Sequence, residues 1–238
     1  MTDIEREPWR DLDLFAPTPE HRLLAESLRE FVAREVEPQA ADHDRAEPFN
    51  HALFLKAGDL GLLGVTIPEE YGGAGLDPIA AVQVLEALST SDPGFGLAVL
   101  AHSILFTQNC YVNGNEEQRK RILPKAVSGE WIGGMCMTEP GVGTDVMGMA
   151  TTATADGDDY IITGVKTFIT NGGIDENTLG DIFIVYAATG PREISSFLVE
   201  KGMDGFALGQ KWVDKLGMRA SYTTELVFND VRVPKANL

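Results

Sequence analysis

The chain has 238 residues, of which 44% are hydrophobic, enough for one large or two ordinary globular domains with a buried core. Its 19 lysines and arginines stand against 36 aspartates and glutamates, which gives a formal net charge of −17. Such a charge repels phosphate backbones and anionic membrane surfaces, so neither a nucleic acid nor a membrane is expected as a partner. The acidic surplus is dispersed along the chain, as on a self-repelling surface.

Neither a metal site nor a targeting segment is predicted. The two cysteines, Cys110 and Cys136, lack CxxC spacing, and no histidine-rich stretch stands near them. Residues 1–17 are charged, lack the apolar core of a signal peptide and are too short to span a membrane. We therefore expect a reduced protein of the cytoplasm.

The first half of the chain is predicted to be helical. From Pro19 onward, apolar residues recur at steps of three and four and form one stripe of a helix, with Thr18 as its N-cap. Further helices are predicted over residues 50–60, 80–88, 96–111 and 116–127. The glycine-dense segment 68–75 is predicted to be a loop.

After Gly129, β-branched and aromatic residues alternate with polar ones over short runs. Strands are predicted near residues 131–138, 149–155, 159–169, 181–188, 194–200 and 223–233. Residues 157–159, Gly-Asp-Asp, are a hairpin signal. The expected fold class is α+β, with a helical domain over residues 1–130 and a β-barrel or sandwich over residues 131–238. This order of elements argues against a βαβ nucleotide-binding fold.

Residues 135–145, MCMTEPGVGTD, carry the first candidate site and run from a strand into a turn. Gly141 and Gly143 permit close backbone approach, and Thr138 and Thr144 supply hydroxyls. The segment is not the dinucleotide fingerprint, because GxGxxG needs a third glycine that is missing here. We expect the turn to flank a polar or anionic planar ligand, and an ordinary solvated β-turn is the alternative.

Residues 166–172, KTFITNG, end a strand with an aromatic ring, a hydroxyl and an Asn-Gly turn. Because strand side chains alternate, Phe168 and Thr170 should share one face while Ile169 points to the other. An aromatic ring beside a hydroxyl suits a flat heteroaromatic ligand. The alternative is that Phe168 is an ordinary core residue.

Together these segments resemble the acyl-CoA dehydrogenase family. Residues 138–145, TEPGVGTD, look like the family signature, and residues 166–172 look like its flavin-facing strand. Other segments resemble family patterns in the family's order: residues 68–75, 123–125 with 129–130, 199–202, 215–221 and 228–234. The resemblance covers nearly the whole chain after about Pro19 and is to the isovaleryl-type and short-chain members.

The resemblance implies an FAD site between the two segments. It places along the flavin's ring edge Met135, Cys136, Met137 and Thr138, with Gly143 and Thr144 in the adjoining turn. It places on the other side Phe168, Ile169 and Thr170. Phe168 replaces a tryptophan common in the family, which keeps the stacking but loses an N–H donor. Thr144 and Arg192 fall where relatives contact the CoA of the substrate.

Members of this family convert acyl-CoA to 2,3-enoyl-CoA: a glutamate removes a proton beside the thioester carbonyl while FAD takes a hydride. The electrons then pass to an electron-transfer flavoprotein. In relatives the glutamate lies in a carboxy-terminal helical domain, which we expect to be absent because this sequence stops at Leu238. Glu139 is expected to be a hydrogen-bonding element of its turn and His102 a packed residue. No catalytic residue is therefore predicted in this chain.

Three interpretations stay open. The chain is a fragment, or one chain of a two-chain dehydrogenase, that needs a helical bundle supplied from elsewhere. It is alternatively an inactive module that binds flavin or acyl-CoA. The third interpretation is an oxidase or monooxygenase of the same fold. The resemblance also implies assembly, either as a homo-oligomer or with the second chain.

Overall fold

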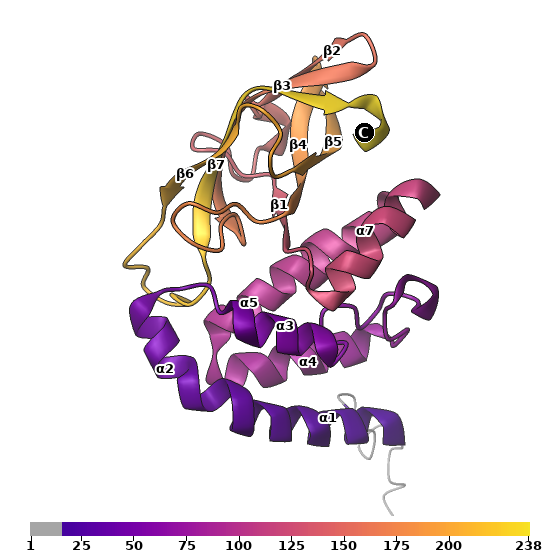
Figure 1. Cartoon of the computed structure of the whole chain (residues 1–238), viewed down its shortest axis with the longest axis vertical. Coiled ribbons are helices and arrows are strands. Elements are labelled where there is room, and N and C mark those ends of the chain that lie inside the picture. The colour runs from indigo at the N-terminus through magenta and orange to yellow at the C-terminus, as the bar shows by residue number, and fades with distance from the viewer. Residues whose placement is uncertain (1–15) are drawn as a thin grey trace, which may run out of the picture.

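Helices occupy the first half of the chain and strands the second, as Figure 1 shows. This computed structural model describes residues 16–238. Most of residues 1–17, in which no signal peptide is predicted, therefore lie outside the described residues. The helices are α1 (Pro19–Phe31), α2 (Glu37–Ala46), α3 (His51–Asp59), α4 (Pro78–Ser91), α5 (Pro93–Leu100), α6 (Asn109–Asn113) and α7 (Glu116–Ser128). π-Helical segments join α1 to α2 at Val32–Val36 and α5 to α6 at Ala101–Gln108.

The start of α1 confirms one prediction, and the presence of α2 was not predicted. Thr18 caps α1, since its hydroxyl accepts a hydrogen bond from the amide of His21 at 3.3 Å. The sequence Glu37-Pro38 resembles a helix break. However, Pro38 lies in the first turn of α2, directly after the π-helical segment Val32–Val36, so the helical run continues through it.

A helical run from Pro93 to Asn113 passes through the middle of the helical layer. Within residues 16–238 it is the helix that is long and apolar enough to cross a membrane, with a mean hydropathy of 1.3. More than half of it, 56%, is buried inside the fold. Val99 and Phe106 are completely buried, so packing within the protein accounts for the apolar composition.

The strands form one sheet in the order β1-β4-β2-β3-β7-β6, with β5 paired to β4. They are β1 (Gly133–Cys136), β2 (Thr152–Asp156), β3 (Asp159–Thr170), β4 (Ile182–Gly190), β5 (Glu193–Glu200), β6 (Phe206–Lys211) and β7 (Thr223–Pro234). The predicted α+β class, helices followed by strands, is thus confirmed. The predicted hairpin is confirmed as well, because Asp156 pairs with Asp159 across a two-residue turn.

Helical and β layers share a core. A cluster of buried residues from the helices, including Phe106, Ile122 and Leu123, packs against Ile184 and Leu198 of the sheet. Figure 1 shows the sheet standing on the helical layer, with α7 next to β1. A further seam contact is the side-chain amide of Asn171, which donates to the carbonyl of Ala98 at 2.9 Å and so ties the end of β3 to α5.

His102 is a second link across the same seam. It is fully buried, its Nε2 donates to the carbonyl of Ala126 at 2.8 Å, and its Nδ1 accepts from the amide of Gly133 at 3.0 Å. Burial lowers the pKa of His102 to about 4, so the ring is neutral at physiological pH. The prediction that His102 is a packed, hydrogen-bonded residue is confirmed.

Candidate flavin site on strands β1 and β3

The structure brings the two candidate segments side by side. The amide of Thr167 on β3 donates to the carbonyl of Thr138, just beyond β1, at 2.8 Å. The ammonium of Lys166 donates to the carbonyl of Met137 at 3.1 Å. Two motifs separated by about thirty residues of sequence therefore form one strip on the sheet.

A buried ion pair lies beneath this strip. Lys166 Nζ contacts Glu139 Oε1 at 2.9 Å, and both side chains are almost completely buried. The Glu139 carboxylate also accepts from the amides of Ala150, at 2.6 Å, and Thr151, at 2.9 Å. Glu139 thus anchors the turn between β1 and β2, as predicted.

The pKa values of both groups of this pair are lowered. Burial opposes the charge of Glu139, but hydrogen bonds from Thr151, Lys166 and Ala150 outweigh it and lower the pKa of that carboxyl. Burial also lowers the pKa of Lys166, while the adjacent carboxylate opposes this shift. A carboxylate held by three donors in this way is poorly suited to accept a proton from a substrate.

The outer face of the strip has the character of a ligand platform. Met135, Met137, Thr138 and Thr170 are half-buried, and Phe168 is 59% exposed. Within the described chain the hydroxyls of Thr138 and Thr170 have no hydrogen-bond partner. The interpretation of Phe168 as an ordinary core residue is therefore wrong. An exposed ring flanked by free hydroxyls can cover and bond a planar heteroaromatic ligand.

Cys136 and Ile169 have their side chains on the opposite side. Both are buried in the core of the sheet, with exposed fractions of 0% and 2%. The predicted alternation around Ile169 is thus confirmed, and any contact of these two residues with a ligand on the outer face must come from the backbone. Burial raises the pKa of the Cys136 thiol, which is unpaired.

Phe168 is held outward by a β-bulge. Between their neighbouring pairs with β7, Thr167 and Phe168 of β3 stand opposite the single residue Glu225. Gly209 and Gln210 of β6 oppose the same residue from the other side, so two bulges flank Glu225. Phe168 takes a left-handed conformation with φ of 57°, which is uncommon for an aromatic residue.

Trp212 adjoins Phe168 and was missed by the sequence analysis. Their ring centroids are 4.9 Å apart, with 32° between the planes. The signal was weak because Trp212 directly follows β6, whose Gly209 and Gln210 interrupt the alternating pattern, and this strand was not predicted.

Gly143, predicted to contact the cofactor, and Thr144 and Arg192, predicted to contact the substrate, lie in turns. Gly143 and Thr144 are exposed in the turn after β1, and a Cβ at Gly143 would meet nothing within 4 Å. Arg192 is exposed in the two-residue turn between β4 and β5. Their roles stay predictions. In the part of the chain that is described, no group of three His, Cys, Asp or Glu side chains could hold a metal ion.

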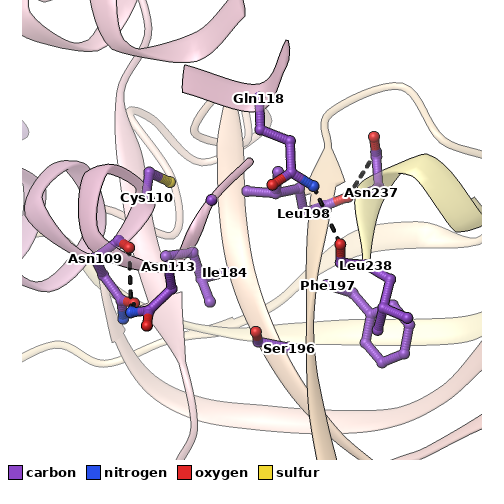
Figure 2. A pocket seen from close by; sticks show the side chains of 11 residues that line it. Asn109, Cys110, Asn113, Gln118, Ile184, Ser196, Phe197, Leu198, Asn237 and Leu238 are labelled. Atoms are coloured by element: carbon purple, nitrogen blue, oxygen red, sulfur yellow. Dashed lines mark hydrogen bonds between the residues drawn. The ribbon is translucent and has the colours of Figure 1, made fainter. Parts of the chain in front are cut away.

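A small cavity, drawn in Figure 2, lies between the helices and β5, away from the strip. Its volume is about 50 Å³, enough for water but far below the 300 Å³ or more of a typical cofactor site. Amide side chains line it and bond one another or the backbone: Asn113 donates to Asn109 at 2.7 Å and Gln118 donates to the Leu238 carbonyl at 3.2 Å. The cavity is therefore too small to be a cofactor site.

Comparison with known proteins assigns the family. Residues 18–130 match the description "Acyl-CoA dehydrogenase, N-terminal domain", and residues 134–231 match "Acyl-CoA dehydrogenase, middle domain". The chain belongs to the acyl-CoA dehydrogenase family. This result confirms the resemblance inferred from residues 138–145 and 166–172.

Acyl-CoA dehydrogenases of several kinds are among the relatives. Mitochondrial isovaleryl-CoA dehydrogenase of Pongo abelii is 41% identical over 92% of this chain and 52% of its own length. A short-chain specific acyl-CoA dehydrogenase of Clostridium acetobutylicum is 41% identical over 94% of this chain and 59% of its own. A glutaryl-CoA dehydrogenase of Mycobacterium smegmatis, solved in complex with FADH2, superimposes with a TM-score of 0.88 at 33% identity, covering 96% of this chain and 57% of that one. The chain thus spans little more than half the length of these relatives.

Proposed function

We propose that this chain supplies the flavin site, and part of the acyl-CoA site, of an FAD-dependent acyl-CoA dehydrogenase. The observation that carries the proposal is the convergence of residues 135–138 with residues 167–170 in one strip, in a family with a solved member that holds FADH2. The strip fits a flavin, since it offers an exposed aromatic ring and two hydroxyls without partners in the described chain. When bound, FAD would supply the acceptor for the substrate's hydride.

The chain's own residues bind and orient in this proposal. Phe168 covers one side of the ring system, and Thr138 and Thr170 hydrogen-bond its polar edge. The turn at Gly143 and Thr144 leaves room for the remainder of the cofactor and for CoA, because no side chain fills the space at Gly143. Arg192 would contact the CoA from its loop.

The proton beside the thioester carbonyl is removed by a carboxylate outside residues 16–238 in this proposal. Glu139, the acidic residue of the family signature, is buried and held by three hydrogen bonds. A helical bundle from further residues of the same protein, or from a second chain, would supply the base. Electrons would then pass to an electron-transfer flavoprotein, and the enzyme would assemble as an oligomer.

Because the Glu139 carboxylate already accepts three hydrogen bonds, it does not serve as a base. This observation also favours a second candidate function, a flavin or acyl-CoA binding module without turnover. Both candidates require FAD binding, and they differ in whether a bound acyl-CoA is oxidised. A supplied helical bundle distinguishes them.

FAD titration of the purified chain tests the proposal. We expect bound flavin, visible as a shifted yellow absorbance, and no reduction of an artificial acceptor by short acyl-CoAs until the bundle is co-expressed. Thr170→Val should weaken FAD binding about two- to tenfold by removing one hydrogen bond. The matched control is Thr163→Val on the same strand, where the hydroxyl bonds Asp230 at 2.7 Å and FAD affinity should not change. A chain that takes up no flavin contradicts the proposal.

A further inference from the structure

Trp212 is fixed at both its backbone and its ring. Its backbone amide donates to the carbonyl of Thr223 at 2.9 Å, which extends the pairing of β6 with β7. Its indole Nε1 donates to the hydroxyl of Thr167 at 3.2 Å. A half-buried tryptophan with both donors engaged has little rotational freedom.

The residues that Trp212 contacts belong to the candidate flavin strip. Thr167, which accepts the indole hydrogen bond, is 2% exposed and donates its own amide to Thr138. Phe168, the next residue, has its exposed ring against the indole at a centroid distance of 4.9 Å. Trp212 therefore contacts two consecutive residues of the bulge, one through a hydrogen bond and one through ring packing.

The bulge by itself does not fix the ring of Phe168. A left-handed φ is strained for an aromatic residue, and more than half of this side chain is open to solvent. In the described part of the chain, Trp212 is the aromatic residue that packs against it. Such a tilted ring contact restricts the plane in which the Phe168 ring lies.

We propose that Trp212 is a positioning residue for the flavin site, which holds the Phe168 ring at a fixed angle and keeps the Thr167 segment against Thr138. This inference rests on the proposed function, because it assigns Trp212 a role toward the same cofactor. The indole of Trp212 enlarges the aromatic surface beside Phe168.

FAD titrations of the full chain test this role, with the dissociation constant and the visible circular dichroism of bound flavin as readouts. Loss of one aromatic contact should weaken binding about two- to tenfold in Trp212→Ala and change the dichroism of the flavin bands. Trp212→Phe, which keeps a ring but removes the hydrogen bond to Thr167, should restore most of the affinity. Trp131→Ala is the control, since Trp131 contacts Lys125 on the helical side.

The outcomes separate the two proposals. If the wild-type chain binds no FAD, the proposed function and this inference both fail. If the wild type binds FAD and Trp212→Ala binds it with the same affinity and dichroism, only the role of Trp212 is overturned. A thermal melt of each variant accompanies the titration and shows whether the variant is folded. If Trp212→Ala proves unfolded, Thr167→Val replaces it. This variant removes the acceptor of the indole hydrogen bond but keeps the Trp212 ring, and it should reproduce a small part of the dichroism change.

Discussion

Replacing His102 should change how the stability of this chain depends on pH. In the folded protein the ring is fully buried, with both nitrogens used across the seam between Ala126 and Gly133. Burial lowers its pKa from an ordinary value of 6.5 to about 4. As the pH falls below the unfolded value, the unfolded chain takes up a proton that the folded chain resists. The stabilisation from the neutral, buried His102 is therefore complete above the unfolded pKa of 6.5 and is lost as the pH falls toward the folded pKa of about 4.

The size of the effect follows from the two pKa values of His102. The full loss amounts to about 3 kcal/mol, and between about pH 7 and about pH 5 the loss is about 2 kcal/mol. His102→Gln keeps an amide donor and acceptor but cannot titrate. The variant should be less stable at neutral pH, where its hydrogen bonds fit less well, yet lose about 2 kcal/mol less than the wild type on acidification.

Urea unfolding at a series of pH values measures this difference. The control is His51→Gln, which removes an exposed imidazole at the start of α3 and so tests whether losing a histidine outside the seam has the same effect. Parallel loss of stability in the wild type and His102→Gln would refute the reasoning, because it would mean that the buried ring does not resist protonation.

Two further predictions concern the strip and its surroundings. Lys166→Met leaves the buried carboxylate of Glu139 without its ion-pair partner and should lower the free energy of unfolding by about 3–5 kcal/mol. The double variant that also carries Glu139→Gln should lose clearly less stability, as measured by urea unfolding. Equal losses in the two variants would contradict the coupling of this pair. Gly133→Ala should cost about 1–3 kcal/mol, because its Cβ would lie 2.1 Å from the ring of Phe106, whereas Gly141→Ala, with nothing within 4 Å, should leave the melting temperature unchanged.

Local patterns sufficed for most of the fold. Helix α1, with its cap at Thr18, and the β2–β3 hairpin at Gly157 depend on residues near in sequence. Helix α2 was hidden because a proline in the first turn looks like a break, and β6 was hidden because its bulge interrupts the alternation. Both elements are stabilised by partners that lie far away in the chain, such as Asp44 of α2 with Arg219.

The structure brings together the two segments that the sequence analysis singled out, while the roles of their residues toward a cofactor stay predictions. The residues of both segments were recognised, and the alternation at Ile169 was correct. The indole of Trp212 could not be assigned, since its place beside Phe168 depends on the register of three strands. The sequence of the turn around Glu139 also did not reveal that its carboxylate pairs with the ammonium of Lys166 on β3.

The bulge at Thr167 and Phe168 places neighbouring residues of this strand under different structural constraints. Phe168 has no partner in the ladder and little of its surface in the core, while Ile169 keeps its buried position. Drift at Phe168 can therefore alter the chemistry presented to a ligand without disturbing the packing on which folding depends. A single bulged position thus places one exposed side chain on this sheet outside the constraints of ladder pairing and core packing.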